Sequence, residues 1–242
     1  MSGREIIDEQ DRRHGAQSEY TLQQMTLIDK NNNQEIRNMR EYSMDISDDH
    51  SRSLIVFDTP ESIMGTALLT WWNRNDESDQ WMYLPAQKRM QRIAKGSKKG
   101  YFMGSDFSFE DIQPEKQDNF DFEIAGETTI SGLPCWMIEV TPNNTRTMES
   151  SGYSRRILYI LKEYFFTVKI EFYDKWNVLL KTQQNGLLQK IDGSRFRANK
   201  IIMINHQTDH KTIIETEDRE INQKINEDIF TERYITTGRH LP

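Results

Sequence analysis

His206 and His210 are the residues whose type and spacing come nearest to a metal site. Imidazole nitrogens are common zinc ligands, and a zinc site needs at least three protein ligands close together. On one extended strand, residues four apart share a face but lie about 13 Å apart at a rise of roughly 3.3 Å per residue, too far to bind one ion. A turn at Gln207–Asp209 would shorten that distance, but no third ligand is apparent. We therefore expect histidines at the end of a hairpin, and no metal.

Catalytic groupings are equally weak. Ser105 precedes Asp106 but is not part of a Gly-x-Ser-x-Gly elbow, and no local motif places a histidine to activate it. Glu110 and Asp111 are adjacent, so on a strand their side chains point to opposite faces and do not form an acid and base pair. Cys135 follows a proline at the start of an apolar run, which favours a small core side chain over a nucleophile. The sequence predicts no catalytic residue and no cofactor.

A basic run stands out in a chain that is acidic as a whole. It begins with Lys88, Arg89 and Arg92 and continues through Lys95, Lys98 and Lys99. Such charges often protect the edge of a sheet against pairing with another chain. They also suit an anionic lipid surface or an acidic protein, where each charge contributes about 1 kcal/mol. We keep both interpretations, with Lys88, Arg89 and Arg92 as the candidate partner-binding residues.

Composition narrows the class of protein. The 242 residues include 31 Lys and Arg against 38 Asp and Glu, a net charge of -7, which argues against a nucleic-acid-binding surface. There is no apolar run of about 20 residues, so no membrane-spanning helix is expected. One cysteine excludes an internal disulfide. Single β-rich domains often reach about 200–250 residues, and residues 1–242 are therefore predicted to form one domain.

The elements that position these residues are mostly strands. After one short helix that ends near Gly15, β-rich runs separated by turn residues indicate about eleven antiparallel strands between Tyr20 and Asp218. In Trp81–Leu84, alternation puts Trp81 and Tyr83 on one face and apolar residues on the other, so both faces need cover. Because a sheet this large curls as its twist accumulates, we expect a curled sheet with helical cover.

Several segments carry a family resemblance that extends over nearly the whole chain. They are Gly65–Thr70, Asp79–Arg89 (DQWMYLPAQKR), Phe102–Asp111 (FMGSDFSFED), Lys169–Asp174, Asn205–Thr212 and Phe230–Tyr234. Together they resemble the outer-membrane lipoprotein-sorting proteins, a LolA-like family in the LolA/LolB lipoprotein-carrier superfamily. The resemblance implies an unclosed half β-barrel with a helical lid on its concave face. It also implies export to the periplasm, so we expect that a signal peptide, absent from this sequence, has been removed.

The function implied by the resemblance is transport, since such relatives carry lipidated proteins or other lipids, and several are companions of RND-type exporters. Aromatic and Met residues gather in the most family-like third of the chain. From these we predict a lipid-binding lining of Trp71, Trp81, Tyr83, Phe107 and Phe109. The leading hypothesis is a monomeric, non-enzymatic carrier of acyl chains or lipidated proteins. The alternative is an adaptor that binds an RND-type exporter or an outer-membrane receptor through its basic strand, with a cavity filled by its own side chains.

Overall fold

The computed structural model describes residues 1–241, without the side chain of Lys95. The chain forms two compact units. Unit 1 consists of Met1–Gly15, Ile28–Asn33 and Lys98–Ile213, and unit 2 of Ala16–Leu27, Gln34–Ser97 and the residues from Ile214 onward. The prediction of one domain over residues 1–242 remains a prediction.

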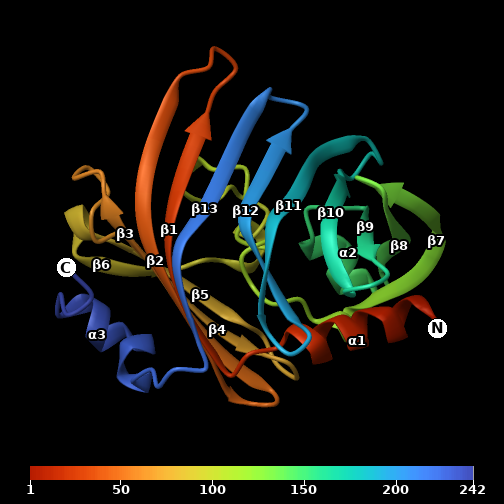
Figure 1. The fold of residues 1–242 in the computed structure, drawn as a ribbon. Helices are drawn as coiled ribbons and strands as arrows, with labels where there is room; N and C mark the ends of the chain where they lie inside the picture. Colours follow the sequence, from red (N-terminus) through yellow and green to blue (C-terminus); the bar gives the residue numbers. More distant parts are fainter. Residues whose placement is uncertain (242) are drawn as a thin grey trace. The chain divides into compact units, whose positions relative to one another are not determined.

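The chain is mainly β, and its strands are hydrogen-bonded in one antiparallel sheet that does not close (Figure 1). The order across the sheet is β6-β5-β4-β3-β2-β1-β13-β12-β11-β10-β9-β8-β7. The strands are β1 (Ser18–Ile28), β2 (Gln34–Ser47), β3 (His50–Thr59), β4 (Ala67–Asn73), β5 (Asp79–Leu84), β6 (Arg89–Arg92), β7 (Phe120–Ile130), β8 (Leu133–Pro142), β9 (Arg155–Leu161), β10 (Phe166–Tyr173), β11 (Leu179–Asp192), β12 (Arg195–Asn205) and β13 (His210–Ile221). This confirms the predicted fold class, with thirteen strands rather than about eleven because each short run between turns forms a strand of its own.

Helices are few and short. The α-helices are α1 (Gly3–His14), α2 (Thr145–Ser150) and α3 (Glu232–Thr236), and the 3-10 helices are η1 (Pro85–Gln87), η2 (Lys95–Ser97), η3 (Phe102–Gly104), η4 (Gln117–Asn119) and η5 (Glu227–Phe230). The predicted helical cover is present within each unit: α1 packs on β7 and β12 in unit 1, while η5 and α3 pack on β3 and β6 in unit 2.

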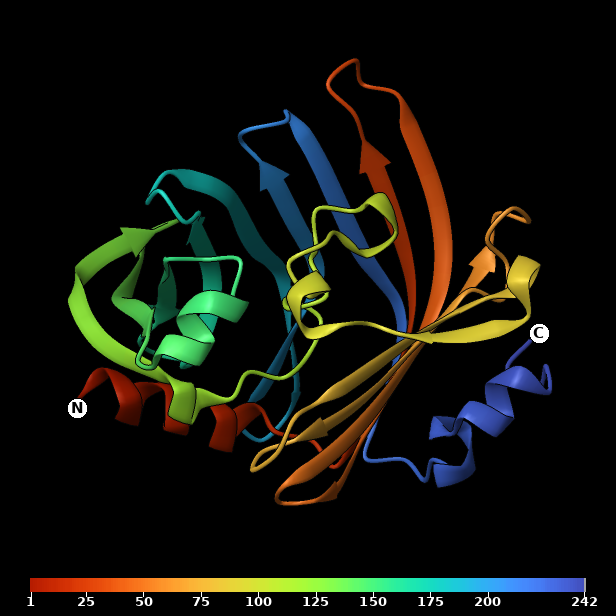
Figure 2. The same cartoon turned by 180° about the vertical axis from the view of Figure 1, so that it is seen from behind.

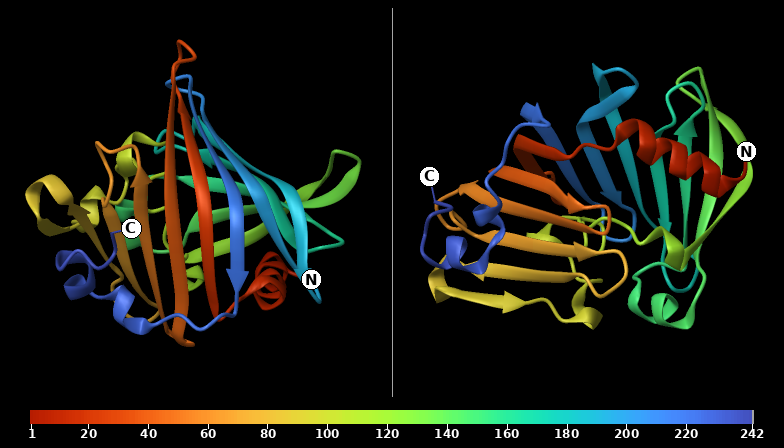
Figure 3. Two further views of the ribbon diagram at one scale, coloured as in Figure 1. Left: turned by 60° about the vertical axis from the view of Figure 1, so that its left-hand side comes forward. Right: turned by 90° about the horizontal axis from the view of Figure 1, so that it is seen from below.

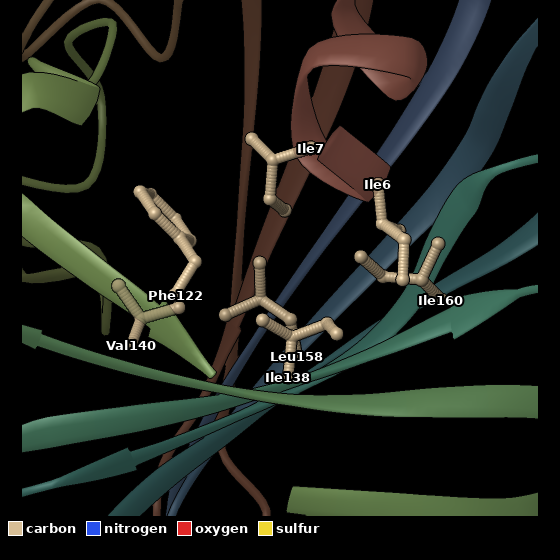
Figure 4. Packing of buried hydrophobic residues seen from close by; sticks show 7 residues of the cluster. All are labelled: Ile6, Ile7, Phe122, Ile138, Val140, Leu158 and Ile160. Atoms are coloured by element: carbon tan, nitrogen blue, oxygen red, sulfur yellow. The ribbon is translucent and has the colours of Figure 1, made fainter. Parts of the chain in front are cut away.

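Helix α1 begins at a capping box. Ser2 Oγ accepts a hydrogen bond from the backbone N–H of Glu5, whose carboxylate accepts one from the Ser2 N–H in return. The helix ends at Gly15, as predicted, although Gly15 has an ordinary φ of -58° and its conformation does not require glycine. Ile6 and Ile7 form the apolar face of the helix. They pack on side chains from β7, β8 and β9, which are Phe122, Ile138, Val140, Leu158 and Ile160 (Figure 4).

Between η2 and β7, unit 1 contains a long irregular segment. Figure 2 shows this yellow-green stretch from behind. Hydrogen bonds tie it to β11 and β12: Lys181 on β11 donates to the Asp106 carbonyl, and Asn205 on β12 donates to the Tyr101 hydroxyl. The segment is therefore packed on the sheet of unit 1 and is not a loose loop.

In unit 2, the C-terminal segment, residues 225–241 with η5 and α3, lies against the strands β3 to β6 (Figure 3). Alternation along β5 puts Tyr83 and Met82 on opposite faces, and both side chains are buried. The same holds on β3, where Val56 and Phe57 are buried on opposite faces. The prediction that Trp81–Leu84 needs cover on both faces is therefore confirmed, and the structure adds β3.

Candidate functional site

Three of the predicted lipid-binding residues, Trp71, Trp81 and Tyr83, form one aromatic face in unit 2. Strands β4 and β5 pair so that Leu69 lies opposite Trp81, and Ala67 opposite Tyr83. Because residues two apart share a face, Trp71 joins this row. The indole rings of Trp71 and Trp81 meet edge to face, with centroids 5.0 Å apart. The sequence pattern therefore identified a real aromatic cluster.

This aromatic face is covered by the protein itself. Phe230 and Ile235 of the C-terminal segment are fully buried in the same cluster as Tyr83. Trp71 Nε1 donates a 2.9 Å hydrogen bond to the Phe230 carbonyl, which fixes the segment over the indole. The segment thus buries Tyr83, while Trp71 and Trp81 remain partly exposed.

His240 fastens the far end of the C-terminal segment. Its buried ring donates from Nε2 to the Gly65 carbonyl at 2.9 Å and packs edge-on against Tyr83, with centroids 5.3 Å apart. Its own carbonyl accepts from Arg40, which Asp58 holds in an ion pair. Burial lowers the pKa of His240, so the ring is neutral near pH 7. No sequence signal singled out this histidine.

The opposite face of the same strands carries a carboxylate that sequence reasoning also missed. Glu41 on β2 pairs with Ile55 on β3, a buried apolar position. Gln23 donates to the Glu41 carboxylate at 3.3 Å. Burial, together with the negative charge of Glu19, raises the pKa of Glu41 to about 7, against the lowering effect of the Gln23 hydrogen bond and of Arg219. Glu41 thus lies among polar and charged neighbours next to the buried Ile55, and its charge changes near neutral pH.

The other two predicted lipid-binding residues, Phe107 and Phe109, belong to unit 1. They lie in the segment Tyr101–Asp111, where the Phe102 N–H donates to the Phe107 carbonyl at 2.7 Å. Phe107 is buried, and the rings of Phe102 and Phe109 meet edge to face at 5.8 Å. The structure thus places the five predicted residues in two clusters, one in each unit.

Buried charges hold this segment in place. Asp106 Oδ2 accepts 2.7 Å hydrogen bonds from the Thr212 hydroxyl and from His210 Nδ1. Asp111 accepts from Lys181 at 2.6 Å and from the Tyr153 hydroxyl at 2.8 Å. Burial and the nearby carboxylates raise the pKa of Tyr153 well above its usual range, so its hydroxyl stays protonated and donates.

The two candidate metal ligands, His206 and His210, take part in separate hydrogen bonds. His206 Nε2 lies 2.8 Å from the Thr182 hydroxyl, whereas His210 pairs with Asp106. Within residues 1–241, no group of three or more His, Cys, Asp or Glu side chains is arranged to hold a metal ion. Cys135 is fully buried, as expected for a core side chain, and burial raises the pKa of its thiol.

The basic residues lie at a sheet edge. Strand β6 is the last strand beside β5, and Lys88, Arg89 and Arg92 are exposed there. Arg92 forms an ion pair with Asp79, and Lys88 adopts a left-handed φ of 46° at the end of η1. Lys98 and Lys99 belong to unit 1, and the Lys95 side chain lies outside the described residues. The position suits edge protection and leaves a partner-binding role as a prediction.

The fold is that of the LolA-like proteins. An outer-membrane lipoprotein-sorting candidate domain from Vibrio parahaemolyticus has a TM-score of 0.90 and 29% identity, covering 97% of this chain and 98% of that one. A DUF1329 family protein from Desulfovibrio piger has a TM-score of 0.90 and 26% identity, covering 96% and 97%. A LolA superfamily protein from Nitrosomonas europaea shares the fold alone, with a TM-score of 0.76 and 18% identity over 97% and 99%.

The family itself is shown by sequence. A family model whose description reads "uncharacterized protein" matches residues 49–237, most of the chain. The chain therefore belongs to this LolA-like family. Comparison with curated proteins gives no significant match. None of the helices in residues 1–241 is long and apolar enough to cross a membrane.

Proposed function

We propose that the protein is a periplasmic, non-enzymatic carrier that holds lipid acyl chains, free or on lipidated proteins, and moves them towards the outer membrane. The observation that supports this most is the aromatic face of Trp71, Trp81 and Tyr83, which is apolar enough for an acyl chain and is shielded by a short segment. The likeness to a lipoprotein-sorting domain points the same way.

The C-terminal segment also bears on how a carrier could release a tightly bound acyl chain. Burying an acyl chain contributes about 0.8 kcal/mol per CH₂, so some twelve methylenes amount to about 10 kcal/mol gross, too tight for simple release. A carrier must offset part of this with contacts made in its empty state. Phe230 and Ile235 make such contacts on the aromatic face, and cargo would have to displace them.

Lipid content tests the proposal directly. Protein purified from a host that contains membranes should carry stoichiometric lipid, detected by mass spectrometry after extraction. Trp81→Ala and Phe107→Ala should lower that content, because each removes an aromatic wall. Trp136→Ala, which removes an indole that packs on Phe165 elsewhere in unit 1, is the matched control. Unchanged lipid content in both test variants, with native circular dichroism, would refute the proposed lipid-binding lining.

Delivery requires a partner, and Lys88, Arg89 and Arg92 are the proposed site for it. An acidic surface on an RND-type transporter or an outer-membrane receptor fits exposed cations at a sheet edge. Reversing the three charges should abolish partner capture and leave lipid content intact if the site serves docking. Capture that survives the reversal would remove these residues from the proposal.

A further inference from the structure

Strands β1 and β2 bring a group of polar side chains together on one face of unit 2. The backbone N–H of Asp45 donates to the Gln17 carbonyl, which fixes how the two strands are aligned. Four residues further along each strand, this register places Thr21 directly opposite Glu41. Side chains that face each other in this way have Cβ atoms about 5 Å apart. The 3.3 Å hydrogen bond from Gln23, the next residue on that face of β1, to the Glu41 carboxylate agrees with this register.

The Thr21 hydroxyl is buried beside Glu41 without a hydrogen-bond partner. Thr21 is only 4% exposed, and its Oγ1 has no partner within the described part of the chain. Leaving a buried polar group unpaired costs about 1–3 kcal/mol, so such groups are rare in native proteins. Because a hydroxyl can accept as well as donate, Thr21 offers a ligand one acceptor next to the carboxylate.

The charges around Thr21 leave one negative charge uncompensated. Glu19, two residues before Thr21, has a cation of its own, since Arg219 Nε on β13 lies 2.8 Å from its carboxylate. Arg219 also acts on Glu41, but less than burial, Glu19 and Gln23 do, and the pKa of Glu41 is raised to about 7. From β3, Glu41 is faced by the apolar Ile55. Two carboxylates and one guanidinium therefore sum to a single negative charge when Glu41 is ionised.

Hydroxyl groups continue this polar surface next to Glu41. Ser43 on β2 lies opposite Ser53 on β3, which in turn lies opposite Thr70 on β4. Thr70 is buried, whereas Glu41, Ser43 and Ser53 are partly exposed. A small ligand can therefore reach the carboxylate and the Thr21 hydroxyl along this row.

We infer that Thr21, Gln23 and Glu41 bind a primary ammonium group, carried by a free amine or by the headgroup of an aminophospholipid. An ammonium has three N–H donors, and the carboxylate, the threonine hydroxyl and the glutamine amide oxygen can each accept one. A divalent metal fits less well, because no three His, Cys, Asp or Glu side chains in residues 1–241 are arranged to hold one. The site lies on the opposite face of the strands from the aromatic face, so it is separate from the proposed acyl-binding lining.

Calorimetric titration of the full chain tests this inference. Ethanolamine should bind, whereas choline, which has no N–H donor, and potassium should bind at least about tenfold more weakly. Binding should strengthen from pH 6 to pH 8 as Glu41 loses its proton, since a primary amine stays charged over this range. Glu41→Gln should weaken binding about tenfold and remove this pH dependence, and Thr21→Val should weaken binding severalfold.

A direct readout comes from the wild type alone. Ethanolamine should lower the pKa of Glu41, which the carboxyl carbon signal reports by NMR. Glycerophosphoethanolamine separates the two sources of the ammonium: tighter binding than that of ethanolamine indicates a lipid headgroup, and equal or weaker binding indicates a free amine.

Glu61→Gln is the matched control, because Glu61 is an exposed carboxylate of unit 2 outside this group. It should bind ethanolamine as the wild type does. No binding of ethanolamine, equal affinity for choline or potassium, or unchanged binding in Glu41→Gln would overturn the inference. No acyl chain takes part in the assay, so its outcome is independent of the carrier function.

Discussion

Lys181 and Asp111 form a fully buried ion pair, with Nζ 2.6 Å from Oδ2 and no measurable exposure of the lysine side chain. The ammonium also donates to the Asp106 carbonyl and faces the ring of Phe172 at 5.1 Å. A buried charge is tolerated only when it is paired and hydrogen-bonded, and here the pair joins β11 to the segment Tyr101–Asp111. Lys181 is thus the charged group among the bonds that hold the segment with Phe107 and Phe109 on the sheet of unit 1.

Replacing Lys181 should lower the free energy of unfolding strongly. Lys181→Met leaves the Asp111 carboxylate buried without its cation, and we expect a loss of about 3–5 kcal/mol in the free energy of unfolding. Urea denaturation measures it, with Lys190→Met on the exposed end of the same strand as control. The double variant Lys181→Met with Asp111→Leu should regain part of the loss. A single variant as stable as the wild type would contradict this assignment.

A second prediction concerns the C-terminal segment. Trp71→Phe keeps an aromatic ring but removes the indole donor to the Phe230 carbonyl. We expect faster amide hydrogen exchange in residues 227–236 and tighter binding of a fluorescent fatty acid, because less has to be displaced. Trp72→Phe is the control, since Trp72 points to the other face of β4. Unchanged exchange in Trp71→Phe would show that this bond does not hold the segment.

A third prediction follows from His14, at the end of α1. Its Nδ1 accepts from the Phe196 N–H at 3.1 Å, while Nε2 donates to the carbonyls of Tyr164 and Phe165. Burial lowers the pKa of His14, so the fold favours the neutral ring.

The stability that His14 contributes is therefore full above the usual histidine pKa of about 6.5 and is lost as pH falls below it, through the lowered pKa of the folded state. The midpoints of urea unfolding, measured between pH 8 and pH 5, report this loss of stability. The loss should be smaller in His14→Gln. Since His240 has a lowered pKa as well, His240→Gln is made in parallel, and the two effects should add. An identical pH dependence in His14→Gln and the wild type would contradict the role of His14.

A fourth prediction concerns Glu41, whose pKa is raised to about 7 by burial. The fold favours its protonated form, so its contribution is full below pH 4.5 and is lost as pH rises towards 7. Glu41→Gln should therefore be more stable than the wild type at pH 8, with the difference vanishing near pH 5. Glu217→Gln at an exposed position of β13 is the control. An equal gain at both pH values would exclude ionisation as the cause.

The strands and the first helix were predictable because their signals are local. Alternation in Trp81–Leu84 predicted two apolar faces, and Gly15 predicted where the first helix ends. The cover over the aromatic face was not predictable in this way. Phe230, Ile235 and His240 are scattered through a short polar stretch without strand or long-helix periodicity, and only tertiary packing brings them onto β3 to β6.

The buried ion pair of Lys181 and Asp111 was not predicted, for a different reason. A lysine in a strand is nearly always at least partly exposed, so nothing in the sequence around Lys181 marks it as a buried one. Its burial depends on Asp111, which lies 70 positions earlier in the chain.

The edge-to-face pair of Trp71 and Trp81 also gives the molecule an optical reporter of its own. Two indoles with centroids 5.0 Å apart couple their electronic transitions, and the coupling depends on their mutual angle, here 70°. Because Trp71 is held by the Phe230 carbonyl, release of the C-terminal segment would let the ring turn and change the circular dichroism of the pair. Cargo uptake could therefore be followed in time without any label.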